Sequence, residues 1–231
     1  MSKLKPKMAL SFSRLDTYLQ CPRKFESMYI TKDYPFETDS PALVKGKQIH
    51  SQLEEWMVAA LKDSTLPNLN AIAKNAVPIM TNILQNYTSI SPENNLAIND
   101  KWEPVGWFDK DVYYRAVVDL MAMKSDTEAV VIDYKTGKVR DYEAGDYAQL
   151  NLTAAMLFSI YPQLEVIKCY YLFVEHKKTS AVSFNRNTLE SLRAPFDKIH
   201  NEINTTEFFD PKVNKYCRFC AIPASRCELK R

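Results

Sequence analysis

Glycine is scarce in this 231-residue chain, and its scarcity argues against two common classes of nucleotide-binding protein. Only Gly46, Gly106, Gly137 and Gly145 occur, and no segment holds several of them close together. A phosphate-binding loop needs closely spaced glycines, because Cβ atoms would keep its backbone amides away from the ligand. The sequence therefore disfavours a P-loop ATPase and a dinucleotide-binding Rossmann domain.

Long apolar runs and a strong charge imbalance are also missing. The longest apolar candidates, such as residues 154–158, fall far short of the ~18 residues of a membrane span. The apolar stretch near the N-terminus is too short for a signal peptide. Thirty basic and 28 acidic residues leave a formal charge of +2, which gives no uniformly basic coat. We expect that the protein does not associate with membranes and that it resides in a reducing cytoplasm. If the protein is phage-encoded, this would be the cytoplasm of the host.

The chain is long enough for one large domain with its own core, and we expect a single domain over residues 1–231.

Among the predicted helices, Ser13 is the expected cap of the first, and Pro78 is expected to disturb the third. Two strand pairs should form antiparallel hairpins, with a loop over 31–44 and a connector over 89–100. The expected class is α/β, a small mixed β-sheet flanked by helices. The predicted helices are 11–30, 45–62, 69–88, 143–160 and 187–203, and the predicted strands are 112–123, 128–136, 164–176 and 179–184.

The sharpest local feature is a hydrophobic strand that ends in Asp133, Tyr134 and Lys135. Residues i and i+2 of a strand share a face, so Asp133 and Lys135 should lie side by side. If the preceding strand pairs around the turn, Asp119 converges on Asp133. Two close carboxylates repel, and a divalent cation such as Mg²⁺ or Mn²⁺ keeps both ionised. The competing interpretation is an exposed hairpin with an ordinary cross-strand salt bridge.

Two further residues fit a metal site of this kind. His50 follows Gly46 by one helical turn, with Glu54 on the same helical face. An imidazole can join carboxylates around a metal, although a lone helical histidine is more often structural. Gln149 opens the helix after the second strand, where it can bond a phosphate or an active-site partner, or simply face solvent.

Taken in order, these residues resemble the RecB-type branch of the PD-(D/E)XK nuclease superfamily. The matches are His50 in Gly-x-x-x-His, Asp119 after a strand, the Asp133–Lys135 core and Gln149. The resemblance implies a restriction-endonuclease-like core. It also implies that His50, Asp119, Asp133 and the main chain of Tyr134 hold the metal, and that Lys135 assists the attacking water. The candidate catalytic residues are thus Asp119, Asp133, Lys135 and Gln149.

The chain departs from the family pattern at two positions. The helix motif commonly continues Gln-x-x-x-Tyr, and here the last position is Thr153, which leaves Tyr147 as the candidate DNA-contacting tyrosine. Ala116 stands where a glycine is often found three residues before the first aspartate. Neither departure removes a metal ligand.

Five cysteines in a cytosolic chain favour metal binding or catalysis over disulfides. Cys217, Cys220 and Cys227 lie in the tail, and Cys21 lies near the start, whereas Cys169 sits in an apolar strand and reads as a buried structural residue. Four thiolates suit either an iron–sulfur cluster or zinc, and spacing alone does not separate the two.

The resemblance extends to these cysteines. One N-terminal and three C-terminal cysteines bind a four-iron four-sulfur cluster in AddB-type nucleases, in the CRISPR-associated RecB-like exonuclease and in phage RecB-like exonucleases. It implies an iron–sulfur subdomain formed by about residues 1–30 together with 204–231, with zinc as the alternative. Basic residues should cluster near it as a DNA-contacting rim: Arg14, Arg23, Lys24, Lys215 and Arg218.

The function expected from this resemblance is metal-dependent hydrolysis of DNA phosphodiester bonds. We expect an exonuclease that prefers single-stranded DNA or DNA ends, in recombination, repair or replication. Without ATPase motifs, any helicase or recombination protein must be a separate partner. The alternative is a non-catalytic iron–sulfur or zinc module that binds nucleic acid. A third possible function is that of a cytosolic enzyme acting on small phosphate esters, which would show no affinity for DNA.

Overall fold

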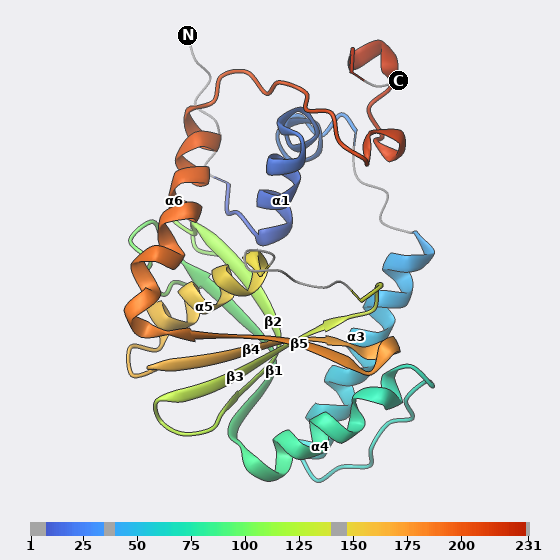
Figure 1. Cartoon of the computed structure of the whole chain (residues 1–231), viewed down its shortest axis with the longest axis vertical. Coiled ribbons are helices and arrows are strands. Elements are labelled where there is room, and N and C mark those ends of the chain that lie inside the picture. Colours follow the sequence, from blue (N-terminus) through green and yellow to red (C-terminus); the bar gives the residue numbers. More distant parts are fainter. Residues whose placement is uncertain (1–7, 35–39, 140–146, 230–231) are drawn as a thin grey trace.

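A five-stranded mixed sheet forms the centre of the protein (Figure 1). The computed structural model describes residues 8–34, 40–139 and 147–229. The strands follow one another across the sheet in chain order, and only the β3–β4 pair is parallel. The mixed sheet and both predicted hairpins, β2–β3 and β4–β5, are confirmed. The strands are β1 (Thr88–Ile98), β2 (Tyr114–Met123), β3 (Glu128–Lys135), β4 (Val166–Phe173) and β5 (Lys178–Asn185).

Helices cover both faces of this sheet, and each face has its own hydrophobic core. One core joins the sheet to α1 (Phe12–Gln20), α5 (Ala148–Ile160) and α6 (Leu189–Thr205). The other joins it to α3 (Pro41–Leu61) and α4 (Val77–Asn86). Figure 1 shows α5 and α6 on one side of the strands and α3 and α4 on the other. The expected α/β architecture is therefore present.

Strand β3 is buried on both faces, which explains its continuous apolar run. Val130, Ile132 and Tyr134 belong to the core beneath α3 and α4. Ala129 and Val131 belong to the opposite core. By strand alternation, Asp133 and Lys135 continue the second set and face α5.

Helix α5 crosses from β3 to its parallel neighbour β4. It is buried along most of its length, since Leu150 and the run 152–158 are all inaccessible. A helix that is apolar all round belongs in the interior. The predicted helix over 143–160 is confirmed from residue 148 onward, and residues 143–146 lie outside the described part of the chain.

The first predicted helix, over 11–30, is wrong as a single element. Helix α1 ends at Gln20, a short helix α2 (Pro22–Phe25) follows, and a π-helical turn covers Glu26–Ile30. Cys21 between them is extended, with φ −164° and ψ 107°. The ring of Pro22 disfavours a helical conformation for the residue before it, so the helix breaks there. The N-cap is Ser11 rather than the predicted Ser13.

The predicted connector over 89–100 is also wrong, because Thr88–Ile98 forms the edge strand β1, paired with β2. Asn, Ser and Pro disfavour a strand, and Ser89 and Glu93 have positive φ angles of 45° and 48°. Pairing with β2 overrides these local preferences. Pro92 is tolerated because an edge strand needs fewer backbone donors than a central one.

Two helix boundaries differ from the sequence prediction for reasons of capping. Helix α3 begins at Pro41, inside the predicted loop over 31–44, because Ser40 caps it by accepting a hydrogen bond from Leu43 N at 3.4 Å. Pro78 stands in the first turn of α4 and starts that helix rather than disturbing it. A short 3-10 turn, Ala73–Ala76, precedes it.

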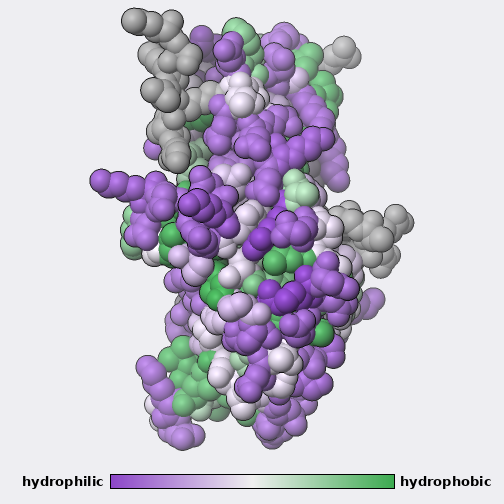
Figure 2. Space-filling model, turned by 90° about the vertical axis from the view of Figure 1, so that its left-hand side faces the viewer, coloured by the Kyte–Doolittle hydropathy of each residue, from purple (hydrophilic) through white to green (hydrophobic). Residues whose placement is uncertain are grey.

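Within the described ranges, none of the helices combines the length and apolar character needed to cross a membrane. Figure 2 shows a mostly hydrophilic face on which apolar side chains form separate patches.

Candidate active site

Asp119 and Asp133 meet where β2 and β3 run side by side. Leu120 and Ile132 are paired in the antiparallel register, and the two aspartates follow directly beyond that pair. The backbone N–H of Tyr134 donates to Asp119 Oδ2 at 2.7 Å. Their side chains are only 14% and 13% exposed. The convergence expected from the sequence is therefore present, and it is not an exposed hairpin surface.

His50 reaches this site from the middle of α3. Its Nδ1 lies 3.0 Å from Asp119 Oδ1, and its ring meets the edge of the Tyr134 ring with centroids 5.7 Å apart. Gly46, one turn earlier, lets the helix approach the end of β3: a Cβ there would lie 3.3 Å from Thr136 Oγ1. The Gly-x-x-x-His spacing thus brings the imidazole against the first carboxylate.

Gln149, in the first turn of α5, joins the other two polar residues of the site. Its Nε2 donates to Asp133 Oδ1 at 2.6 Å, and its Oε1 accepts from Lys135 Nζ at 2.8 Å. Lys135 Nζ also lies 2.6 Å from Asp133 Oδ2. Gln149 therefore has an active-site partner at each end of its amide, and the solvent-facing alternative for it is excluded.

Burial dominates the electrostatics of the site. It raises the pKa of Asp133 to about 6, because the favourable charge of Lys135 does not fully offset desolvation and the repulsion from Asp119. For His50, burial alone would lower the pKa, but the hydrogen bond and charge of Asp119 outweigh burial and raise it. Both pKa shifts indicate that the positive charge near the two buried carboxylates does not balance their negative charge.

The residues fit a divalent metal ion by their chemistry. Asp133 Oδ2 is buried and accepts no well-aligned hydrogen bond within the described residues, so its short contact with Lys135 is an ion pair only. A cation would satisfy that oxygen and the charge shortage. Nowhere in ranges 8–34, 40–139 and 147–229 do three His, Cys, Asp or Glu side chains already form a metal-binding group. In this arrangement the acidic oxygens instead contact His50, Lys135, Gln149 and the Tyr134 N–H.

The sequence did not reveal Tyr171, whose ring contacts the ammonium group of Lys135. Tyr171 is the parallel-register partner of Asp133 on β4, and Lys135 Nζ lies 4.8 Å from the centre of its ring. The rings of Tyr147 and Tyr171 are stacked, with centroids 5.9 Å apart and an angle of 8° between their planes. The Tyr147 hydroxyl is 2.6 Å from Ser180 Oγ. Only knowledge of the β3–β4 pairing would have identified this cluster.

All four of the predicted cluster cysteines line one small cavity between the start of the chain and its tail. The cavity holds about 20 Å³ of free space. The backbone N–H of Lys212 donates to Cys21 Sγ at 3.4 Å, and that of Asn214 donates to Cys217 Sγ at 3.3 Å. Cys169 is fully buried in β4, as expected for a structural residue, and burial raises the pKa of its thiol. The cysteines that line the cavity are Cys21, Cys217, Cys220 and Cys227.

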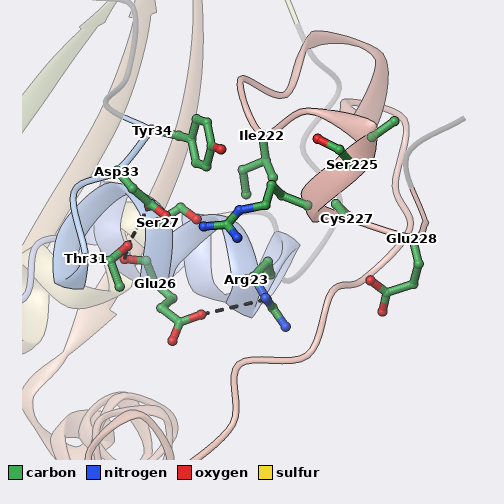
Figure 3. Close-up of a pocket in the computed structure, with 12 residues that line it drawn as sticks. Arg23, Glu26, Ser27, Thr31, Asp33, Tyr34, Ile222, Ser225, Cys227 and Glu228 are labelled. Carbon is green, nitrogen blue, oxygen red and sulfur yellow. Dashed lines mark hydrogen bonds and ion pairs between the residues drawn. The ribbon is translucent and has the colours of Figure 1, made fainter.

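The tail is held against the first helices by several long-range contacts. Asn214 Nδ2 donates to Gln20 O at 2.9 Å, and Arg23 Nε donates to Phe209 O at 3.0 Å. A second cavity of about 540 Å³ lies between the two segments. Figure 3 shows Arg23 and Glu26 from the N-terminal side of this cavity and Ile222, Ser225 and Cys227 from the tail.

The predicted basic rim is only partly assembled around the cysteines. Arg23 and Lys24 line the cysteine cavity. Arg14 does not: it lines a separate cavity that Gln149 also borders. Arg14 lies in the first turn of α1, and Cys21 follows the last turn of the same helix.

The chain is similar in sequence to one known protein family over nearly its whole length. No curated protein sequence shows significant similarity to it. A solved structure described as "Crystal structure of SSO0001" is similar with a TM-score of 0.48 and 16% identity, over 100% of this chain and 90% of that one. Residues 9–228 match the sequence model of one nuclease family. The chain belongs to the PD-(D/E)XK nuclease superfamily.

Proposed function

We propose that the protein is a divalent-metal-dependent deoxyribonuclease whose active site lies between the middle of β2 and the end of β3. The observation that carries this proposal is the buried carboxylate of Asp133, set between Lys135 and Gln149 and beside the His50–Asp119 pair. Membership of a nuclease superfamily supports a nucleic acid as substrate.

In this proposal each polar residue has a separate task. His50, Asp119, Asp133 and the carbonyl of Tyr134 would hold Mg²⁺ or Mn²⁺. The ion would supply positive charge that favours attack by water on a phosphodiester and stabilises the charge developing on the phosphate. Lys135 adds a second positive charge and orients the attacking water. Gln149 holds Lys135 and Asp133 in their relative positions through its amide.

We propose further that the substrate is DNA with free ends, preferably single-stranded, and that the enzyme is an exonuclease of recombination, repair or replication. This part rests on the resemblance of the motifs to RecB-type nucleases. Strand separation would then come from a separate helicase or recombination protein. The non-catalytic alternative keeps the same scaffold and DNA affinity but predicts no cleavage.

The test is cleavage of end-labelled linear and covalently closed circular DNA, single- and double-stranded, in EDTA, Mg²⁺ or Mn²⁺. We expect metal-dependent loss of the linear single strand, with circles resistant, and Mn²⁺ at least as effective as Mg²⁺ because an imidazole ligand suits Mn²⁺. Asp119→Asn should be inactive. Cleavage in EDTA, or none by the wild type with either metal, would overturn the proposal.

We also propose that Cys21, Cys217, Cys220 and Cys227 bind a four-iron four-sulfur cluster that joins about residues 1–30 to 204–231 as a subdomain. The support is their common cavity and the two backbone N–H groups that donate to sulfur. Hydrogen bonds to sulfur are a usual feature of such clusters. Anaerobically purified protein should be brown and contain iron and sulfide. A colourless protein with one equivalent of zinc would contradict the iron assignment.

A further inference from the structure

A cavity of about 410 Å³ opens beside the active site, on the side of α1. Its wall includes Ser11 at the start of α1, Trp107 from the loop between β1 and β2, and Gln149 of α5. Gln149 is the residue that bonds Asp133 at 2.6 Å. Gln149 therefore borders the cavity and also contacts a carboxylate of the proposed active site.

The cavity is positively charged and its charge is not neutralised. Arg14 and Arg115 both line it, and among the described lining residues there is no carboxylate. Neither arginine forms an ion pair within the described part of the chain, and Arg115 Nε is buried without a hydrogen-bond partner there. Arg14 is held in place by a hydrogen bond to Ala9 O and by the Tyr29 ring, 5.2 Å away. Two unpaired, partly buried guanidinium groups favour an anion.

Burial, with a further contribution from nearby Arg115, lowers the pKa of Arg14. Both arginines line the same cavity, where their like charges repel. The start of α1 adds to the same field: the side chain of Ser11 forms no cap hydrogen bond, and the first turn contains no acidic residue. First-turn amide groups left in this state attract phosphate oxygens.

Two aromatic rings lie beside Arg115 of this cavity. The Arg115 guanidinium is 5.4 Å from the Trp107 ring centre and 5.9 Å from that of Phe108. Phe108 is 87% exposed, which is unusual for so large an apolar side chain. An exposed ring beside an arginine is the arrangement on which nucleobases stack in proteins that bind single strands.

We propose that this cavity and the adjoining rings form a strand-guiding groove for single-stranded DNA, defined by Arg14, Trp107, Phe108 and Arg115. One backbone phosphate lies between the two arginines at the start of α1, and a neighbouring base stacks on Phe108 and Trp107. The strand then passes Gln149 to the carboxylates. Duplex DNA binds less well, because its bases are already stacked on one another. This inference rests on the proposed nuclease function and adds the residues that select the strand.

The test measures binding separately from cleavage. Fluorescein-labelled oligo-dT and a duplex of the same length are titrated with full-length protein in EDTA, and anisotropy gives Kd at several salt concentrations. Phe108→Ala, at an exposed position that leaves the core intact, should weaken single-strand binding about tenfold and duplex binding much less. Arg115→Gln should weaken it similarly and reduce the slope of log K against log salt by about 0.7, whereas Arg115→Lys should restore that slope. Lys74→Gln, an exposed cation remote from the groove, is the matched control.

The outcomes separate this inference from the nuclease proposal. If the wild type degrades DNA and both groove variants bind single strands as it does, the groove is wrong and the nuclease proposal stands. If the variants lose single-strand binding but no metal supports cleavage by the wild type, the groove stands and the nuclease proposal falls. The groove would also be overturned if an acidic peptide bound through Arg115 and both variants bound oligo-dT with wild-type affinity.

Discussion

Gln149 donates a hydrogen bond to Asp133 at 2.6 Å and thereby ties the first turn of α5 to the end of β3. The opposite end of the same amide accepts from Lys135 at 2.8 Å. One side chain therefore sets the separation between the carboxylate and the ammonium group. Because a small misplacement in an active site is costly, this relationship should matter for rate more than for folding.

Gln149→Ala should lower kcat by about 10- to 100-fold, since Lys135 and Asp133 lose their shared support. DNA binding in EDTA should change little. Steady-state cleavage of a labelled oligonucleotide measures the effect. Asn151→Ala, two residues further along α5 and so on a different side of the helix, is the control and should keep wild-type kcat. An unchanged kcat in Gln149→Ala would contradict the positioning role.

Gly46 should tolerate alanine but not a large side chain. A Cβ at this position meets only Thr136 Oγ1, at 3.3 Å, which a small shift relieves. Gly46→Ala should keep activity and stabilise the protein by up to about 1 kcal/mol through helix propensity. Gly46→Leu should push α3 away from β3, displace His50 and lower activity about tenfold or more. Cleavage rates and thermal unfolding measure both effects, and equal activity of the two variants would contradict this account of the motif.

Cys21→Ser should abolish iron binding and loosen both ends of the chain. Cys21 shares its cavity with the three tail cysteines, and metal binding is coupled to local folding. Iron and sulfide analysis, visible absorbance and limited proteolysis measure these effects. Cys169→Ala is the control: this thiol is buried in β4 away from the cavity, so the iron content should be unchanged. Equal iron loss in the control would contradict the ligand assignment.

Tyr114→Phe should reduce the free energy of unfolding by about 1 kcal/mol. The fully buried Tyr114 hydroxyl donates to Phe196 O at 2.8 Å and so attaches α6 to the start of β2. Chemical denaturation measures the loss. Tyr170→Phe is the control, since this half-buried strand tyrosine makes no hydrogen bond within the described residues. A loss of the same size in the control would show that the effect is not specific to this bond.

Much of the fold could be predicted because its signals are local. The apolar run before Asp133 and the turn-like residues after Met123 predicted the β2–β3 hairpin, and that register is what brings Asp119 to Asp133. The helical face around Ile49 and Leu53 predicted α3. The chemistry-bearing residues could be identified for the same reason, since their spacing follows strand and helix periodicity.

The rest depended on contacts between distant segments. Strand β1 has a polar sequence and exists because β2 offers a pairing edge. Tyr171 lies beneath Lys135 only because β4 pairs in parallel with β3, which periodicity does not reveal. The cavity that Arg14 lines is formed by segments far apart in the sequence, around α1, Trp107 and Gln149, so helix periodicity did not reveal it.

The most direct test of the central claim is Mn²⁺ binding by Asp133→Asn, followed by electron paramagnetic resonance beside a cleavage assay. We predict that the wild type binds Mn²⁺ and cleaves DNA. The variant should bind the ion at least about tenfold more weakly and show no measurable cleavage. Its unfolding temperature should not fall, because burying the Asp133 charge is unfavourable and its pKa is raised for that reason. Wild-type Mn²⁺ affinity and cleavage in Asp133→Asn would contradict the account.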